Sequence, residues 1–172
     1  RYIRRQRQMC IRDRCIGIGD FAYYGNGSGD YNTCIGGQNM RQYYVTSSYN
    51  VALGYNAMRN ANGANNIAIG YNSLYTSSST TSISNNVGIG DNAGRYNRGA
   101  NNVFLGSRAG HGASTTNLTG NNKIIIGRDA EPSSASISNE ITLGNSSITA
   151  LRCQVTSITA LSDERDKTAI ED

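Results

Sequence analysis

The chain has 172 residues, among them 20 glycines and one proline, and a formal net charge of +4. Its longest aliphatic run, Ile124-Ile125-Ile126, is far shorter than the roughly 20 apolar residues that cross a bilayer, so we expect no membrane insertion. Ile, Leu, Val and Phe account for only 31 residues. So low a share favours disorder when the net charge is high; with a small net charge, we instead expect a core made by stacking and completed by other chains.

The positive charge is concentrated at the amino end. Residues 1–14 contain six arginines and one aspartate, whereas the remainder has 10 basic and 11 acidic residues. A basic arm that binds nucleic acid is one interpretation of this end. Residues 5–14 also resemble translated sequencing-adapter remnants at the ends of metagenomic fragments. We therefore predict that 1–14 is a non-native or disordered end, and we expect no nucleic-acid partner.

From residue 15 to residue 145 one short phrase recurs: an apolar residue, a small residue, Ile or Leu, and then Gly. Successive closing glycines are 16 to 21 residues apart. A near-fixed period of this length indicates a repeat architecture. The closing glycines are Gly19, Gly36, Gly54, Gly70, Gly90, Gly106, Gly127 and Gly144.

Each copy of the phrase predicts one short strand followed by a turn. Val51 and Leu53 share one face of such a strand and Ala52 takes the other, while the closing glycine supplies a positive φ that turns the chain. A single unit is too small to bury a core, but stacked units form a continuous one. We therefore predict an all-β fold: a parallel β-roll or β-helix solenoid of about eight short repeats.

Asparagines precede several of the predicted strands. We expect them at corners, where their side chains bond neighbouring backbone and tolerate left-handed geometry. Between the strands lie turn-rich inserts of variable length, and binding specificity, where present, is expected in those inserts. The eleven tyrosines are suited either to lining a sugar-binding surface or to packing corners against neighbouring subunits. The asparagines concerned are Asn50, Asn66, Asn86 and Asn102.

The repeats resemble two related protein families. Residues 66–74, Asn-Ile-Ala-Ile-Gly-Tyr-Asn-Ser-Leu, are similar to the head repeats of trimeric autotransporter adhesins. Residues 101–110, Asn-Asn-Val-Phe-Leu-Gly-Ser-Arg-Ala-Gly, look like repeats common in phage tail fibres. Both families are parallel β-rolls or β-helices wound as homotrimers. The resemblance therefore implies an intertwined homotrimer, with the chain itself as its principal partner.

After Gly144 the pattern changes. Residues 146–161 alternate apolar and polar side chains and predict a β connector. Residues 162–172 begin with Ser162, Asp163 and Glu164, which is typical of a helix start. We expect this segment to be the truncated beginning of a further module.

The segment from Leu161 to Thr168 resembles the opening of the endosialidase-type intramolecular chaperone, a self-cleaving module of phage tail fibres and tailspikes. The resemblance implies Ser162 as the nucleophile and Lys167 as the base, with the cleavage junction at Leu161, Ser162 and Asp163 on either side of Ser162. From the residues alone, Ser162 is an ordinary helix cap and Lys167 a solvated charge, because a separation of five does not place two side chains on one helix face. We expect no activity without the downstream module.

The sequence gives little support for a metal site, a glycosylation site or a glycosidase site. The four cysteines show no zinc-ligand spacing, and His111 has no metal partner nearby in sequence, so we expect neither a metal nor a cofactor. Asn26, Asn117 and Asn145 begin glycosylation-type triplets that match by chance. A glycosidase requires two carboxyl groups within about 5–10 Å, and no acidic pair stands out, so a polysaccharide depolymerase is disfavoured.

Taken together, these features predict a structural and adhesive segment of a trimeric tail fibre or tailspike, located in the virion tail. It would contact a host-surface glycan or protein receptor and be followed by a self-cleaving chaperone. The alternative is the head of a trimeric surface adhesin on the bacterial cell.

Overall fold

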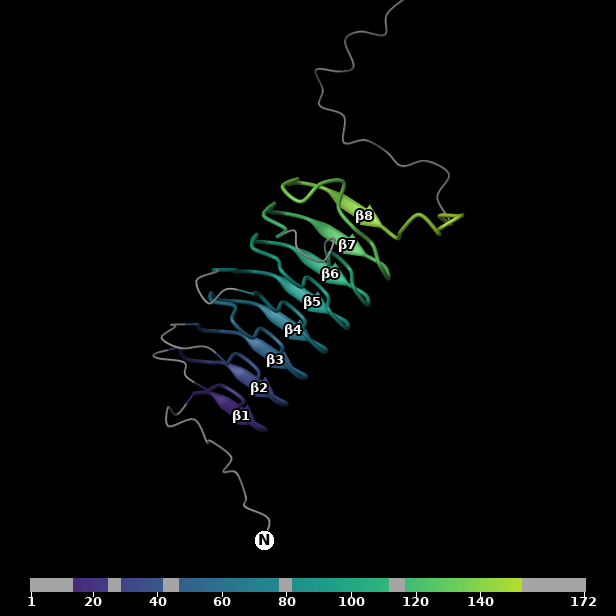
Figure 1. Cartoon of the computed structure of the whole chain (residues 1–172). Coiled ribbons are helices and arrows are strands. Elements are labelled where there is room, and N and C mark those ends of the chain that lie inside the picture. Colours follow the sequence, from purple (N-terminus) through teal and green to yellow (C-terminus); the bar gives the residue numbers. More distant parts are fainter. Residues whose placement is uncertain (1–13, 25–28, 42–46, 78–81, 112–116, 153–172) are drawn as a thin grey trace, which may run out of the picture.

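The chain forms a stack of coils, each of which contributes one strand to a single parallel sheet (Figure 1). The computed structural model describes residues 14–24, 29–41, 47–77, 82–111 and 117–152. Consecutive strands are hydrogen-bonded neighbours throughout the sheet. The strands are β1 (Ile16–Ile18), β2 (Thr33–Ile35), β3 (Val51–Leu53), β4 (Ile67–Ile69), β5 (Val87–Ile89), β6 (Val103–Leu105), β7 (Ile124–Ile126) and β8 (Ile141–Leu143).

The eight strands coincide with the eight copies of the sequence phrase, and the predicted all-β solenoid is confirmed. Equivalent residues pair in register, for example Ala52 with Ala68. Among the described residues there is no α-helix. The predicted basic end is described only at Arg14, and the predicted helix start at 162–172 lies outside the described residues. Of the predicted connector, residues 146–152 contain a turn at 146–147 and no strand, and 153–161 are not described.

The middle residue of each strand points into the coil. Cys34, Ala52, Ala68, Phe104 and Ile125 are completely buried there. The flanking residues of the phrase point outward, as expected from the alternation of side chains along a strand. The middle residue of the phrase therefore belongs to the core, and the flanking aliphatic residues lie on the surface of the sheet.

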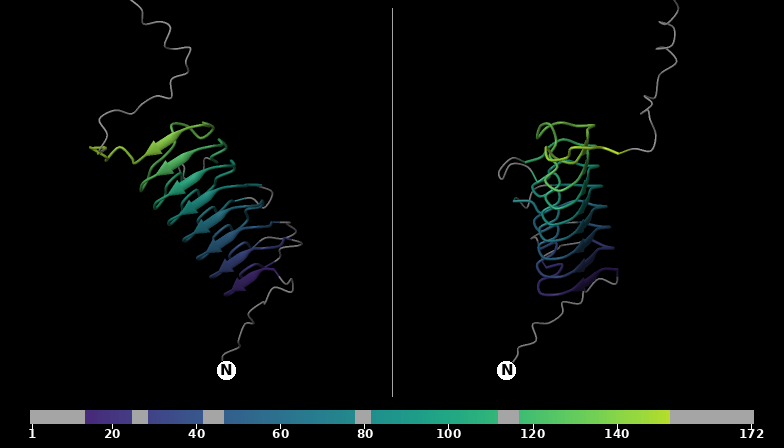
Figure 2. Two further views of the ribbon diagram at one scale, coloured as in Figure 1. Left: turned by 180° about the vertical axis from the view of Figure 1, so that it is seen from behind. Right: turned by 90° about the vertical axis from the view of Figure 1, so that its right-hand side faces the viewer.

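Behind the sheet, the chain returns through a segment of alternating backbone handedness. After Gly70 (φ 128°), left-handed φ angles recur at Asn72 (50°) and Leu74 (49°). Their N–H groups donate in opposite directions: Asn72 to the carbonyl of Tyr55 in the preceding coil (3.0 Å) and Leu74 to that of Ala93 in the next (2.9 Å). This return segment thus forms a second ladder between coils without being a β-sheet. Figure 2 shows the resulting stack from two further sides.

Core packing matches large residues with small ones across the coil. Leu74 on the return segment faces Gly88 of β5, where a Cβ would lie 2.8 Å from Cγ of Leu74. Phe104 of β6 occupies space that Gly94 and Gly110 leave open, because a Cβ on either would lie 2.5 Å or less from its ring. Bulky core residues therefore come either from the sheet or from the return segment, and small residues of the same or a neighbouring coil face them.

The closing glycines behave as predicted. All eight have positive φ, from 80° at Gly144 to 132° at Gly90. Space is limiting as well: a Cβ on Gly70 would lie 2.5 Å from the carbonyl oxygen of Gly90 in the next coil. Close approach of successive coils and an unusual backbone angle thus both require glycine at this corner.

Candidate functional site

The outward face of the sheet is lined almost entirely by aliphatic side chains. Its two columns of side chains come from the first and third residues of each strand, and apart from Thr33 they are all Ile, Val or Leu. The third-position column is Ile18, Ile35, Leu53, Ile69, Ile89, Leu105, Ile126 and Leu143, and the first-position column is Ile16, Thr33, Val51, Ile67, Val87, Val103, Ile124 and Ile141.

These columns form a long apolar stripe, which we call the apolar face. Exposed fractions include 36% for Ile126, 53% for Ile16 and 66% for Ile141. Seven strand pairings separate β1 from β8, and at about 4.8 Å each they give the stripe a length of roughly 34 Å. Neither column contains a charged side chain. A continuous exposed apolar strip of this kind marks an interaction surface.

Stacked tyrosines lie beyond both ends of the strands, at the rims of the apolar face. Tyr31 and Tyr49 precede β2 and β3, and their rings are 5.0 Å apart and nearly parallel. Tyr55 and Tyr71 follow β3 and β4 at 6.0 Å, and Gln38 Nε2 donates to the Tyr55 hydroxyl at 2.9 Å. Within each pair, one ring covers a face of the other. This arrangement favours the packing interpretation over a row of open sugar-stacking platforms.

A ladder of buried asparagines runs through the coils beside the sheet, one residue before each of the strands β2 to β6. Asn66 is typical: its Oδ1 accepts from the backbone N–H and from Nδ2 of Asn86, at 3.0 and 3.1 Å. Its own Nδ2 donates to Oδ1 of Asn50 at 3.0 Å and to two carbonyl groups. The rungs are Asn32, Asn50, Asn66, Asn86 and Asn102, and all are buried.

The asparagine prediction needs one correction. The side chains do bond neighbouring groups, but the left-handed residues are those immediately before the rungs, such as Asn65 (φ 60°), Asn85 (58°) and Asn101 (59°). The rungs themselves do not have left-handed φ, because each directs its backbone N–H to the preceding rung and its carbonyl into the sheet ladder.

The ladder ends at a buried lysine. Lys123 occupies the next rung, where its backbone N–H donates to Asn102 Oδ1 at 2.9 Å. Its side chain is 0% exposed, and Nζ has no hydrogen-bond partner. Burial lowers the pKa of the Lys123 ammonium, and the nearby Glu140 carboxylate opposes that shift.

Glu140 stands at the following rung, immediately before β8. Its carboxylate accepts a hydrogen bond from the hydroxyl of Ser133, which is the main cause of its lowered pKa. The Ser133 backbone N–H (2.8 Å) and the Thr142 hydroxyl (3.0 Å) also donate to it. Glu140 is thus satisfied by its own coil, whereas Nζ of Lys123 has no hydrogen-bond partner and only the electrostatic attraction of Glu140.

The predicted catalytic pair is outside the region described. Ser162, Lys167 and the junction residues Leu161 and Asp163 all fall in 153–172. Within the described residues, no group of three or more His, Cys, Asp or Glu side chains is arranged to hold a metal ion. A search of the same residues for a helix long and apolar enough to span a membrane finds none.

Comparison of the chain with protein-family models, with curated proteins and with solved structures finds no match. The apolar face, the asparagine ladder and the surface chemistry therefore carry the functional assignment.

Sequence reasoning did not identify two of these features. It left open which side of each strand faces the core, although the middle residue was a usable signal, because it is small (Gly, Ala or Cys) in most copies while the flanking residues are large. It also missed Lys123. Aligning the residue before each strand would have placed that lysine in a column of asparagines.

Proposed function

We propose that the chain is a structural and adhesive segment of a homotrimeric phage tail fibre, in which three copies pack their apolar faces around a common axis. The observation that supports this proposal is the apolar face, a straight charge-free strip the length of the sheet. Burying aliphatic surface contributes about 25 cal/mol per Å², and two neighbouring copies per chain offer that burial. The choice of three copies follows the resemblance of the repeats to trimeric fibres and adhesins.

Register supports an assembly along the whole rod. Because every strand has three residues and pairs in line with the next, the two aliphatic columns are straight. Straight columns on identical chains can meet along their entire length, which is how a rigid fibre is built from short repeats. The described surface away from this face then remains available for contact with a host.

For the segment beyond the described residues, we propose that Ser162 and Lys167 belong to a self-cleaving chaperone completed by downstream sequence. The support is the Leu161–Thr168 resemblance. Burial within a complete module would lower the pKa of the lysine so that it could act as a base. The virion tail is the location that this proposal implies.

The interface is tested with two matched substitutions. Ile69→Lys places a charge in the middle of the apolar face, and Leu151→Lys places the same charge at a residue that is 66% exposed and outside the sheet. Sedimentation velocity should show that Ile69→Lys abolishes the trimer while Leu151→Lys retains it. A trimer that persists in Ile69→Lys contradicts the proposed interface.

A further inference from the structure

A column of arginine and aromatic side chains runs along the end of the return segment. It is formed by the fifth residue after the closing glycine in each of the first six coils. Backbone hydrogen bonds keep successive levels aligned, as from Thr76 N–H to the carbonyl of Arg59 (3.2 Å) and from Tyr96 N–H to that of Tyr75 (2.7 Å). The successive residues are Tyr24, Arg41, Arg59, Tyr75, Arg95 and His111; we call Arg41, Arg59 and Arg95 the arginine column.

Each of these three guanidinium groups is held by an amide three residues earlier. Nη1 of Arg41 donates to Gln38 Oε1 at 3.3 Å, and Nη1 of Arg59 donates to Asn56 Oδ1 at the same distance. Arg95 donates to Asn92 Oδ1 at 3.2 Å. The repeated clamp places the guanidinium groups at corresponding points of their coils. Such preorganisation reduces the entropy lost when a ligand binds.

Aromatic rings provide a second support. The guanidinium carbon of Arg95 lies 4.6 Å from the ring centroid of Tyr96 and 5.5 Å from that of Tyr75. Arg41 lies 5.3 Å from the ring centroid of Phe21 and 6.0 Å from that of Tyr24. These cation–π contacts hold the guanidinium groups of Arg41 and Arg95 without neutralising their charge.

The charges of the arginine column have no acidic counterpart in the described structure. The ion pairs among the described residues involve Arg108 and Arg128, both with Asp129. The Nε atoms of Arg59 and Arg95 are buried and make no hydrogen bond. Arg41 and Arg59 are one coil apart, and Arg59 and Arg95 are two coils apart. At about 4.8 Å per coil, these separations are roughly 5 and 10 Å along the rod. Like charges so close together, rigidly held and unpaired, favour a bound polyanion.

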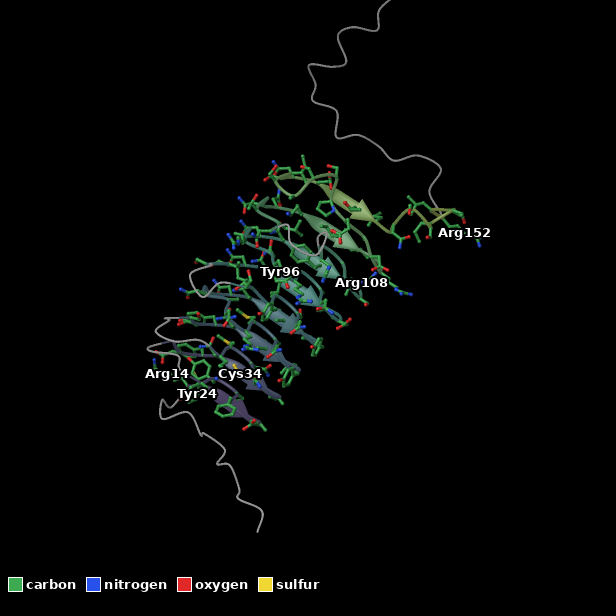
Figure 3. All side chains as sticks on the ribbon, in the orientation of Figure 1. Arg14, Tyr24, Cys34, Tyr96, Arg108 and Arg152 are labelled. Carbon is green, nitrogen blue, oxygen red and sulfur yellow. The ribbon has the colours of Figure 1, made fainter. Side chains whose placement is uncertain are left out.

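The column and the apolar face lie on different parts of the coil. The sheet forms one layer, and the arginine column ends the return segment behind it. In Figure 3, Tyr24 and Tyr96 lie on the side where the strands begin, whereas Arg108 lies beyond the strand ends. Counted from this position to the residue before the next strand, the separation varies from 7 residues (Arg59 to Asn66) to 12 (His111 to Lys123). The column is therefore at the corner where the repeats vary most in length.

We propose that the arginine column binds an acidic polysaccharide laid along the long axis of the rod. This inference rests on the proposed function and specifies the class of its surface ligand. A guanidinium fork matches a carboxylate or sulfate in bidentate geometry, and a linear chain with acidic groups at intervals of one or two coils follows the column. Single-stranded nucleic acid fits less well, because its bases need open aromatic faces, and Arg95 already covers Tyr75 and Tyr96.

The experiment measures binding of the 172-residue chain by isothermal titration calorimetry. The probes are polygalacturonate oligomers, dextran sulfate, neutral dextran and a deoxythymidine oligonucleotide. Arg59→Gln and Arg95→Gln each remove one guanidinium from the column. Arg128→Gln is the control, because it removes one arginine at the opposite end of the return segment, where Arg128 is paired with Asp129. Sedimentation velocity on every variant reports the trimer separately from the ligand.

We expect an acidic polysaccharide to bind and neutral dextran not to bind. Each column variant should weaken binding about tenfold, as expected for the loss of a charge-assisted bidentate contact, and Arg128→Gln should weaken it less than about twofold. Stronger binding of polygalacturonate than of dextran sulfate identifies a carboxylate ligand, and the reverse order identifies a sulfated one. Arg95→Lys, which keeps the charge but loses the fork, should bind more weakly than the unmodified chain.

Three results overturn the inference. They are no binding of either acidic polysaccharide, equal losses in Arg128→Gln and the column variants, and tighter binding of the oligonucleotide than of both polysaccharides. If these occur while the trimer is intact, the ligand assignment fails and the proposed fibre survives. If the unmodified chain does not form a trimer, the proposed fibre is refuted instead.

Discussion

Replacing the buried lysine at the end of the asparagine ladder should stabilise the protein. Lys123→Met keeps an unbranched side chain of similar length and removes an amino group that is fully buried and without a hydrogen-bond partner. An unsatisfied buried polar group costs about 1–3 kcal/mol, and more when it is charged. The attraction lost at Glu140 is small by comparison, because that carboxylate is exposed to solvent screening and keeps its Ser133 and Thr142 partners.

We therefore expect Lys123→Met to raise the free energy of unfolding by about 1–3 kcal/mol at pH 7. Urea unfolding at a fixed chain concentration measures this change, and the denaturant slope should stay constant. The control is Arg152→Met, which removes an exposed cation and should alter stability by less than about 0.5 kcal/mol. Destabilisation by Lys123→Met would show that the lysine has a partner that this account lacks.

The sign of the pH dependence provides a second check. Burial lowers the folded-state pKa of Lys123 from its usual value of 10.5, so below 10.5 the unfolded chain binds more protons at this site. Stability of the unmodified protein therefore rises with pH as it approaches 10.5, by at most about 1.4 kcal/mol per pH unit. The advantage of Lys123→Met should shrink from pH 7 to pH 10. The pH dependence that the two proteins share cancels in the difference, so a constant difference contradicts the assignment.

Three further predictions concern the ladder, the turn and the tail. Asn66→Ala removes five side-chain hydrogen bonds and should cost about 3–5 kcal/mol in urea unfolding; a loss below about 1 kcal/mol would mean that the ladder is not stabilising. Gly70→Ala forces a Cβ to within 2.5 Å of a backbone carbonyl oxygen at φ 128°, whereas in Gly37→Ala the nearest atom is on a tyrosine ring at 2.9 Å. The first should therefore lower the melting temperature far more than the second, and equal effects would contradict the packing account. In a chain extended through the complete module, Ser162→Ala and Lys167→Ala should each abolish a lower-mass product on a denaturing gel; unchanged cleavage in both refutes the Ser–Lys assignment.

The repeat phrase was sufficient to predict the fold because it carries both requirements of a coil. Gly54 and its equivalents mark the turns by their positive φ, and the alternation around Ala52 marks a strand. Sequence could not supply the conformation of the return segment. Its left-handed residues include Met58 and Leu74, side chains with no intrinsic preference for that region, and the hydrogen bonds between coils impose the geometry.

The candidate surfaces were less predictable because they depend on which residues share a column. Arg41, Arg59 and Arg95 are separated by inserts of different length, so their alignment emerges only when each coil is counted from its closing glycine. The ladder position of Lys123 is hidden in the same way. The Ser162 and Lys167 assignment rests on resemblance alone and stays a prediction.

The most direct test of the proposed assembly is the mass of the native particle. The chain has a mass of 18.5 kDa, and an apolar face shared by three copies requires a particle three times as heavy. Sedimentation equilibrium of the purified chain, with circular dichroism to confirm that it is folded, measures this directly. A folded trimer is the expected result. A folded, stable monomer with its apolar face in water would contradict the account.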